Sequence, residues 1–196
     1  MRKRKTIELY HYWQAIRGTD EAPYRRALDP GAIRNLLPDL FILEDEGNDG
    51  ACFRLAGTRI CADFGQELRA TAFSKLWVSE QRHMIRALFS DVMQREAPVV
   101  LDVTASTRSG QMVAMEMVVL PLRSNGETSD RIVGALATDR PANWHGSDLL
   151  VELTCTATSQ PGKAYVASGR RNTAIDLDAK SVGSFLPHRP QTTSRS

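Results

Sequence analysis

Residues 111–122 read Gln-Met-Val-Ala-Met-Glu-Met-Val-Val-Leu-Pro-Leu, an apolar run from Met112 onward that only Glu116 interrupts. Alternate side chains of a β-strand point to opposite faces of its sheet. One face therefore carries Val113, Met115, Met117 and Val119, and the other carries Met112, Ala114, Val118, Leu120 and Leu122. Because both faces are apolar, both need a cover. We expect the helices between the strands to cover one face, and the N-terminal helix, a second subunit or both to cover the other.

Further strands are predicted on both sides of this segment. They alternate apolar and polar residues or follow turn signals, and they lie at residues 40–43, 52–56, 99–105 and 132–138. After the last of them, Ser147 predicts the N-cap of a short closing helix that carries Leu149, Leu150 and Leu153. The sheet is therefore expected to have five strands.

Two helices have clear apolar faces. The stronger one spans about residues 79–96, where apolar side chains recur at helical intervals at Met84, Ile85, Leu88, Phe89, Val92 and Met93. The other spans residues 7–16, with Leu9, Tyr12, Trp13 and Ile16 on one aromatic and apolar face. Two strands, a helical insertion and three more strands predict an α+β domain with a five-stranded antiparallel sheet. Several small α+β folds share this count.

Composition excludes several classes of protein. Hydrophobic residues make up 42% and charged residues 24% of 196 residues, which is close to the globular average and excludes collagen-like and coiled-coil chains. We expect no membrane span, because no apolar run reaches the roughly 18–20 residues that a span needs. The opening Met-Arg-Lys-Arg-Lys is followed by Tyr10, His11 and Gln14 instead of an apolar signal segment, which predicts a cytoplasmic protein. The odd number and wide spacing of the cysteines, Cys52, Cys61 and Cys155, predict no disulfide framework. Four scattered histidines predict no metal site.

The charge distribution separates a tail from the rest of the chain. Residues 1–156 carry 19 Lys and Arg against 21 Asp and Glu, a net −2, whereas residues 157–196 carry 6 against 2, a net +4. The tail is rich in Ser, Thr, Gly and Pro and poor in large apolar residues, which predicts disorder. We therefore expect an N-terminal helix or cap at 1–18, a folded domain at 19–155 and a basic, mostly disordered tail at 156–196.

A set of short motifs resembles a bacterial PAS-like family that was formerly described only as a domain of unknown function. The motifs occur in the family's order over about residues 8 to 140, and they are Tyr12-Trp13, Arg25 with Asp29-Pro30, Leu37-Pro38-Asp39-Leu40-Phe41, Phe53-Arg54-Leu55-Ala56-Gly57-Thr58, Phe64-Gly65, Leu76-Trp77, Glu116, Leu120-Pro121-Leu122 and Arg131-Ile132-Val133-Gly134-Ala135. The resemblance implies a PAS fold used as a small, stand-alone sensory or adaptor domain. One departure is at Arg69-Ala70, near which the family often has a glycine, in a loop that borders the usual PAS cavity.

The resemblance places a ligand cavity between the sheet and the short helices. Phe64, Phe73 and Trp77 are core residues or, where a cavity exists, its lining. Arg25 is either a structural partner of a carboxylate such as Asp29 or an anion clamp. Glu116 either forms a salt bridge within the fold, to Arg54 or Arg25, or contacts a ligand, because a buried carboxylate needs a partner.

Three functional hypotheses follow. The first is a signalling protein that senses a small apolar or amphipathic ligand or acts through partner proteins. The second is a ligand-free adaptor that docks on another regulator. An enzyme is a distant third, because none of the nucleophile, metalloprotease or kinase motifs occurs, and we expect neither a catalytic residue nor a bound cofactor. We expect no specific nucleic-acid binding. A homodimer is predicted, with Leu9, Tyr12, Trp13 and Ile16 of the helix and Met115 and Met117 of the strand at the dimer or partner face.

Overall fold

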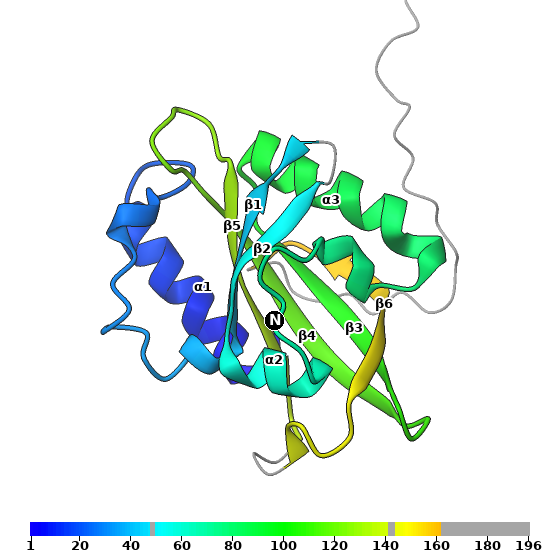
Figure 1. Cartoon of the computed structure of the whole chain (residues 1–196). Helices are drawn as coiled ribbons and strands as arrows, with labels where there is room; N and C mark the ends of the chain where they lie inside the picture. Colours follow the sequence, from blue (N-terminus) through cyan, green and yellow to red (C-terminus); the bar gives the residue numbers. More distant parts are fainter. Residues whose placement is uncertain (48–49, 141–143, 162–196) are drawn as a thin grey trace, which may run out of the picture. The chain divides into compact units, whose positions relative to one another are not determined.

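Six antiparallel strands form one sheet, in the order β2–β1–β5–β4–β3–β6 (Figure 1). The computed structural model describes residues 1–47, 50–140 and 144–161. Its strands are β1 (Leu40–Asp45), β2 (Ala51–Ala56), β3 (Val99–Thr107), β4 (Met112–Leu122), β5 (Arg131–Thr138) and β6 (Leu150–Ser159). Its helices are α1 (Arg4–Arg17), α2 (Thr58–Phe64) and α3 (Arg82–Arg95), with short 3₁₀ turns η1 (Arg25–Ala27), η2 (Leu37–Asp39), η4 (Phe73–Leu76) and η5 (Ser79–Gln81). The predicted α+β class is confirmed.

The two faces of the sheet carry separate apolar clusters, one under α3 and the other under α1 (Figure 1). We call these the inner and the outer face. Met115 and Met117 of β4 pack on the inner face with Phe89 of α3, while Leu120 packs on the outer face with Trp13 of α1. The alternation predicted for residues 111–122 is therefore confirmed, and each face has its own helical cover.

The segment after Ser147 forms strand β6 instead of the predicted closing helix. Leu153 is buried in the inner core, and β6 pairs with β3 from Val100 to Thr107. The prediction was wrong because leucine spacing alone does not record the open edge of β3, whose backbone groups need partners. The sheet accordingly has six strands, and the domain boundary expected after residue 155 falls inside β6. The rest of the predicted tail, residues 162–196, lies outside the described residues.

Loop segments cover both edges of the sheet. On β6, Val78 donates its N–H to the carbonyl of Leu153 (3.0 Å), and the Gln81 side chain bonds both the N–H and the carbonyl of Cys155. On β2, Phe53 exchanges backbone hydrogen bonds with Ala70 and Thr71. Exposed strand edges recruit other strands, so these loops protect the central part of each edge strand.

Two glycines allow close approaches that fix the hairpin and its neighbour. A Cβ on Gly57 would lie 2.3 Å from the carbonyl oxygens of Leu37 and Pro38, and a Cβ on Gly134 would lie 2.2 Å from the Phe41 ring. A larger residue at either position has no room. Gly57 thus lets η2 pack against the start of α2, and Gly134 lets Phe41 lie across β5.

Candidate functional site

Aromatic rings fill the space between the inner face and the short helices, where the sequence places a cavity. The Phe73 ring lies 4.6 Å from Phe89, 5.4 Å from Phe53, 5.6 Å from Phe41 and 5.8 Å from Trp77, measured between ring centroids. All five residues are almost completely buried, and Phe64 belongs to the same cluster. Phe64, Phe73 and Trp77 are therefore core residues, and none of them lines either of the two surface hollows described below.

The aromatic cluster contains one buried polar group without a hydrogen-bond partner among the described residues, the indole N–H of Trp77. Trp77 has no exposed surface, and its Nε1 has no hydrogen-bond partner among the described residues. A buried donor without an acceptor costs about 1–3 kcal/mol. The centre of the core thus retains one unsatisfied polar group that an added acceptor would stabilise.

The predicted polar residues of the cavity, Arg25 and Glu116, do not reach it. Arg25 is exposed in η1, where its backbone N–H donates to the carbonyl of Arg123 (2.7 Å). Glu116 lies on the outer face and is 1% exposed. Glu116 does not reach the cavity because β4 directs it away from the inner core. The structure does not bring Arg25 and Glu116 together.

Glu116 holds the N-terminal segment against the sheet. Its carboxylate accepts hydrogen bonds from the backbone N–H of Arg2 (2.8 Å) and of Lys3 (3.1 Å) and from the hydroxyl of Thr6. Its one cationic neighbour among the described ion pairs is Arg2, with Nε 3.9 Å from Oε2. The expected partners Arg54 and Arg25 are not involved, and Arg54 instead lies 3.7 Å from Glu44.

The basic N-terminal residues are paired with acids of the domain. Arg2 binds Asp102 of β3 (2.5 Å), Lys3 pairs with Asp139 after β5, and Lys5 binds the buried Asp39 of η2 (2.7 Å). Asp39 also pairs with Arg59 of α2. These ion pairs therefore anchor the cationic start of α1 to the domain. The sequence contains the acids that pair with it, but not their proximity.

The predicted dimer-face residues divide between the two sides of the sheet. Leu9 and Trp13 are buried on the outer face of their own chain, and the Trp13 Nε1 donates to the carbonyl of Pro121 (2.9 Å). Met115 and Met117 are buried on the inner face, so they cannot share a surface with the helix. Tyr12 bonds the loop at residues 27–29, and Ile16 is half-buried. The six residues predicted for the dimer or partner face therefore do not lie on one surface, and α1 covers the outer face within its own chain.

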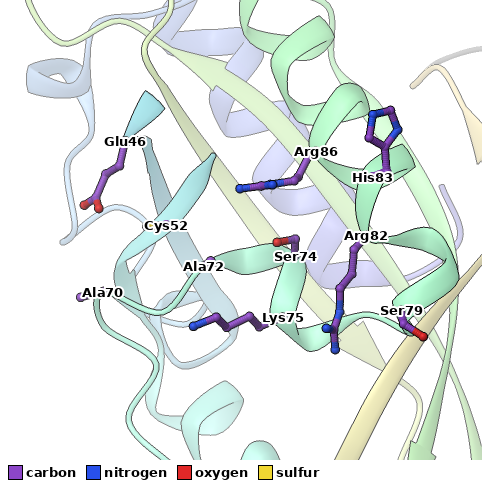
Figure 2. Close-up of a pocket in the computed structure, with 10 residues that line it drawn as sticks. All are labelled: Glu46, Cys52, Ala70, Ala72, Ser74, Lys75, Ser79, Arg82, His83 and Arg86. Carbon is purple, nitrogen blue, oxygen red and sulfur yellow. The ribbon is translucent and has the colours of Figure 1, made fainter. Parts of the chain in front are cut away.

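A surface hollow of about 550 Å³ lies between β2, η4 and the start of α3 (Figure 2). The cationic side chains of Lys75, Arg82 and Arg86 line it, and Glu46 is the one carboxylate among its described lining residues. Figure 2 shows Lys75 and Arg86 reaching toward the same space in front of β2. Sequence reasoning missed this site, although Arg82 and Arg86 are spaced by one helical turn and could have indicated a basic helix face.

A buried Asp–His pair fixes the loop before β6. Both carboxylate oxygens of Asp63, in α2, lie within hydrogen-bond distance of His145 Nδ1, at 2.8 and 2.9 Å. Burial raises the pKa of the Asp63 carboxyl, and the bonds to His145 oppose that rise. Leu149, a few residues later, packs where a Cβ on Gly65 would stand. This pair holds the chain against α2 just before it enters β6.

The thiols of Cys61 and Cys155 show no sign of activation. Burial raises the pKa of the Cys155 thiol to about 11, and burial also raises the pKa of Cys61. A nucleophilic cysteine needs a lowered pKa. Within residues 1–47, 50–140 and 144–161, no group of three His, Cys, Asp or Glu side chains is placed to hold a metal ion. The described helices include none that is long and apolar enough to cross a bilayer.

Comparisons with known proteins gave one family match and several distant structural similarities. The sequence model of the family described as "PAS domain" matches residues 1–137. A Rhodobacter sphaeroides LOV protein is 11% identical, with a TM-score of 0.43 over 60% of this chain and 73% of that one. The PAS domain of an HTR-like protein from Haloarcula marismortui is 13% identical, with a TM-score of 0.43 over 55% of this chain and 89% of that one. No curated protein sequence matches. On the family match, which spans more than half of its residues, the chain belongs to the PAS domain family.

Proposed function

We propose that this PAS domain is a non-catalytic signalling module of the cytoplasm that acts through protein–protein contacts. Family membership supports a sensory or interaction role in general. The observation that favours contacts over an enclosed ligand is the aromatic cluster around Phe73, whose four ring neighbours occupy the usual cavity. Protein interiors pack to the density of organic crystals, and a ligand cannot enter without displacing these rings.

The surface best suited to such contacts is the part of the outer face that α1 leaves open. Strand register aligns Ala114, Thr104 and Thr154 in one row, and Met112, Ser106 and Glu152 in the next. Met112 is 61% exposed, and α1 packs on β4 and β5. We call these two rows the open sheet face. Four small, neutral side chains and one carboxylate, Glu152, surround one exposed methionine, which suits a flat protein contact with a polar rim, and we propose this face for the homodimer or for a regulatory partner.

A second candidate function, sensing of a small ligand, is favoured by the unsatisfied indole N–H of Trp77. A ligand with a hydrogen-bond acceptor would satisfy this donor if Phe73 or its neighbours moved aside. Burial of its apolar part in the aromatic cluster would add to its affinity. The two candidates differ in whether the purified chain retains or binds a small molecule.

Mass spectrometry of the native full chain tests the choice directly. The expected result is the mass of the polypeptide alone, together with no thermal stabilisation by fatty acids, aromatic acids or nucleotides. A ligand that binds only the folded state at a hundred times its Kd would add about 2.7 kcal/mol of stability, which is easily detected. A retained molecule, or a stabiliser, would overturn the contact-only proposal in favour of sensing.

The variant Trp77→Phe also distinguishes a contact-only module from a ligand sensor, because it changes the unsatisfied donor in the core. It removes the unsatisfied N–H and keeps an aromatic ring, so we expect a change in unfolding free energy of less than about 1.5 kcal/mol. Trp77→Ala is the matched cavity-forming control, with an expected loss of about 3–5 kcal/mol. If Trp77→Phe loses as much unfolding free energy as Trp77→Ala, the indole N–H has a hydrogen-bond partner. That result would support the ligand-sensing hypothesis.

A further inference from the structure

We infer that the cationic hollow between β2, η4 and the start of α3 binds an acidic segment of a partner protein. The inference rests on the proposed function and names the chemistry of one contact. It is separate from the open sheet face, because Lys75, Arg82 and Arg86 come from η4 and from α3, which packs on the inner side of the sheet.

Cationic side chains outnumber carboxylates among the described residues of this hollow and of a second one that shares Arg86 with it. Lys75, Arg82 and Arg86 line the first hollow with one carboxylate, Glu46, and the second hollow adds the carboxylate of Asp45. Arg82 Nε donates to the carbonyl of Trp77 (3.0 Å), which fixes the guanidinium at the edge of the hollow. The hydroxyls of Ser74 and Ser79 also line it and supply neutral donors. Such a set of donors complements carboxylates, because guanidinium and ammonium groups make their strongest hydrogen bonds to ionised oxygens.

The shape of the site favours an extended chain over a compact ligand. His83 and Arg86 line both the first hollow and a second one of about 470 Å³, which continues along α3 past Gly50 and Ala51 to Met93. Together the two hollows form one groove, which we call the α3 groove. Figure 2 shows the residues that line the first hollow. A peptide segment can follow such a groove with several acidic residues.

Recognition in this groove must come from side chains. The neighbouring edge strand β2 already exchanges backbone hydrogen bonds with Ala70 and Thr71 through Phe53, and Cys52 forms a β-bridge with Ala72. A partner therefore cannot add a strand at this point without displacing the loop. Contacts to Lys75, Arg82 and Arg86 remain as the source of affinity and selectivity.

The chain's own tail does not suit the groove. Residues 157–196 carry six basic residues against two acidic ones, so they share the sign of the groove's charge. An Asp- or Glu-rich segment of another protein has the complementary charge, and electrostatic attraction would also raise its rate of association. A partner of that chemistry is the occupant we propose.

Fluorescence anisotropy with a labelled Glu-rich peptide and the full chain tests the inference. We expect saturable binding that weakens as salt rises, and no binding of the matched Gln-rich peptide. The double variant Lys75→Glu/Arg86→Glu should weaken binding about tenfold or more, because it places like charges against the ligand. The control Arg34→Glu/Arg108→Glu makes the same change in net charge at exposed sites outside the groove and should change binding by less than about twofold.

Three outcomes would overturn the inference: no binding of the Glu-rich peptide, equal loss in both double variants, or preferential binding of a single-stranded oligonucleotide. Circular dichroism and a thermal melt of each variant exclude unfolding as the cause of a loss. Failure of the groove inference can be told apart from failure of the proposed function. If an identified regulator binds the wild type and the Lys75→Glu/Arg86→Glu variant equally, but not a variant of the open sheet face, the groove inference is wrong and the interaction module stands.

Discussion

The carboxylate of Glu116, in the middle of β4, accepts a hydrogen bond from the hydroxyl of Thr6 in α1, and both residues are buried. The same carboxylate accepts the backbone N–H groups of Arg2 and Lys3 just before the helix begins. A negative charge at a helix N-terminus also interacts favourably with the helix dipole. One side chain of the sheet thus positions the N-terminal helix.

Loss of the Glu116 carboxylate should detach the start of α1. Glu116→Ala leaves the N–H groups of Arg2 and Lys3 without their acceptor, while the Thr6 hydroxyl keeps the carbonyl of Lys3. We expect a loss of about 2–4 kcal/mol in unfolding free energy. Urea denaturation measures the loss, and hydrogen exchange should show faster exchange in α1. The control is Glu8→Ala, which removes the exposed pair of Glu8 with Arg4 and should cost about 0.3–0.5 kcal/mol. A Glu116→Ala variant as stable as the control would show that the anchor lies elsewhere.

Glu96 should make stability depend on pH in the acid range. Its carboxylate accepts hydrogen bonds from Arg123 Nε (2.8 Å) and Nη2 and from Ser129 Oγ (2.8 Å), and the bonds from Arg123 lower the pKa of Glu96. A carboxyl whose folded pKa is lowered stabilises the fold above its unfolded pKa, near 4.3. That contribution is lost as pH falls through the lower, folded pKa.

Comparing Glu96→Gln with the wild type at several pH values measures this effect. At pH 7 we expect the variant to be less stable by about 1.5–3 kcal/mol, the typical value of hydrogen bonds to a charged group. The difference should shrink as pH falls below about 4, because the wild-type carboxyl then becomes neutral as well. A difference that stays constant from pH 7 to pH 3 would show that Glu96 acts through packing.

Replacing Ala70 by glycine, which the family often carries near this position, should make the fold more stable. Its φ of 61° lies in the left-handed region, which strains a residue with a Cβ. We expect Ala70→Gly to raise the unfolding free energy by about 0.5–1 kcal/mol. Ala87→Gly, at an exposed position inside α3, is the opposite control and should lower it by about 1 kcal/mol. Thermal or urea unfolding compares the two, and destabilisation by Ala70→Gly would contradict the assignment of strain.

Met112 tests the open sheet face as a contact surface. If the chain forms the expected homodimer through this face, Met112→Glu should weaken it at least about tenfold, since it buries a charge in an apolar contact. Light scattering after size exclusion measures the change. Leu55→Glu, at a 47% exposed site on the opposite edge strand, is the matched control. Equal behaviour of the two variants, or a monomeric wild type, would remove this face as the dimer interface.

Local pattern was sufficient to predict the α+β class, the N-terminal helix, the long helix and the central strand. The period of side chains along a strand or helix follows from backbone geometry, and so Met115 and Leu120 could be assigned to opposite faces before any contact was known. The same reasoning failed at Leu150 and Leu153, where a short leucine pattern fits either helix or strand. Pairing with β3 made that segment a strand.

Tertiary structure alone decided which groups meet at the candidate site. Glu116 faces the N-terminal helix, Phe73 fills the expected cavity, and Lys75 and Arg86 share a groove, although nothing in their sequence spacing states this. The physical reason is that a buried charge or ring is satisfied by whatever the fold brings within a few ångströms, and those partners come from segments as far apart as residues 6 and 116. Sequence identifies the groups that need partners, and only packing selects the partners.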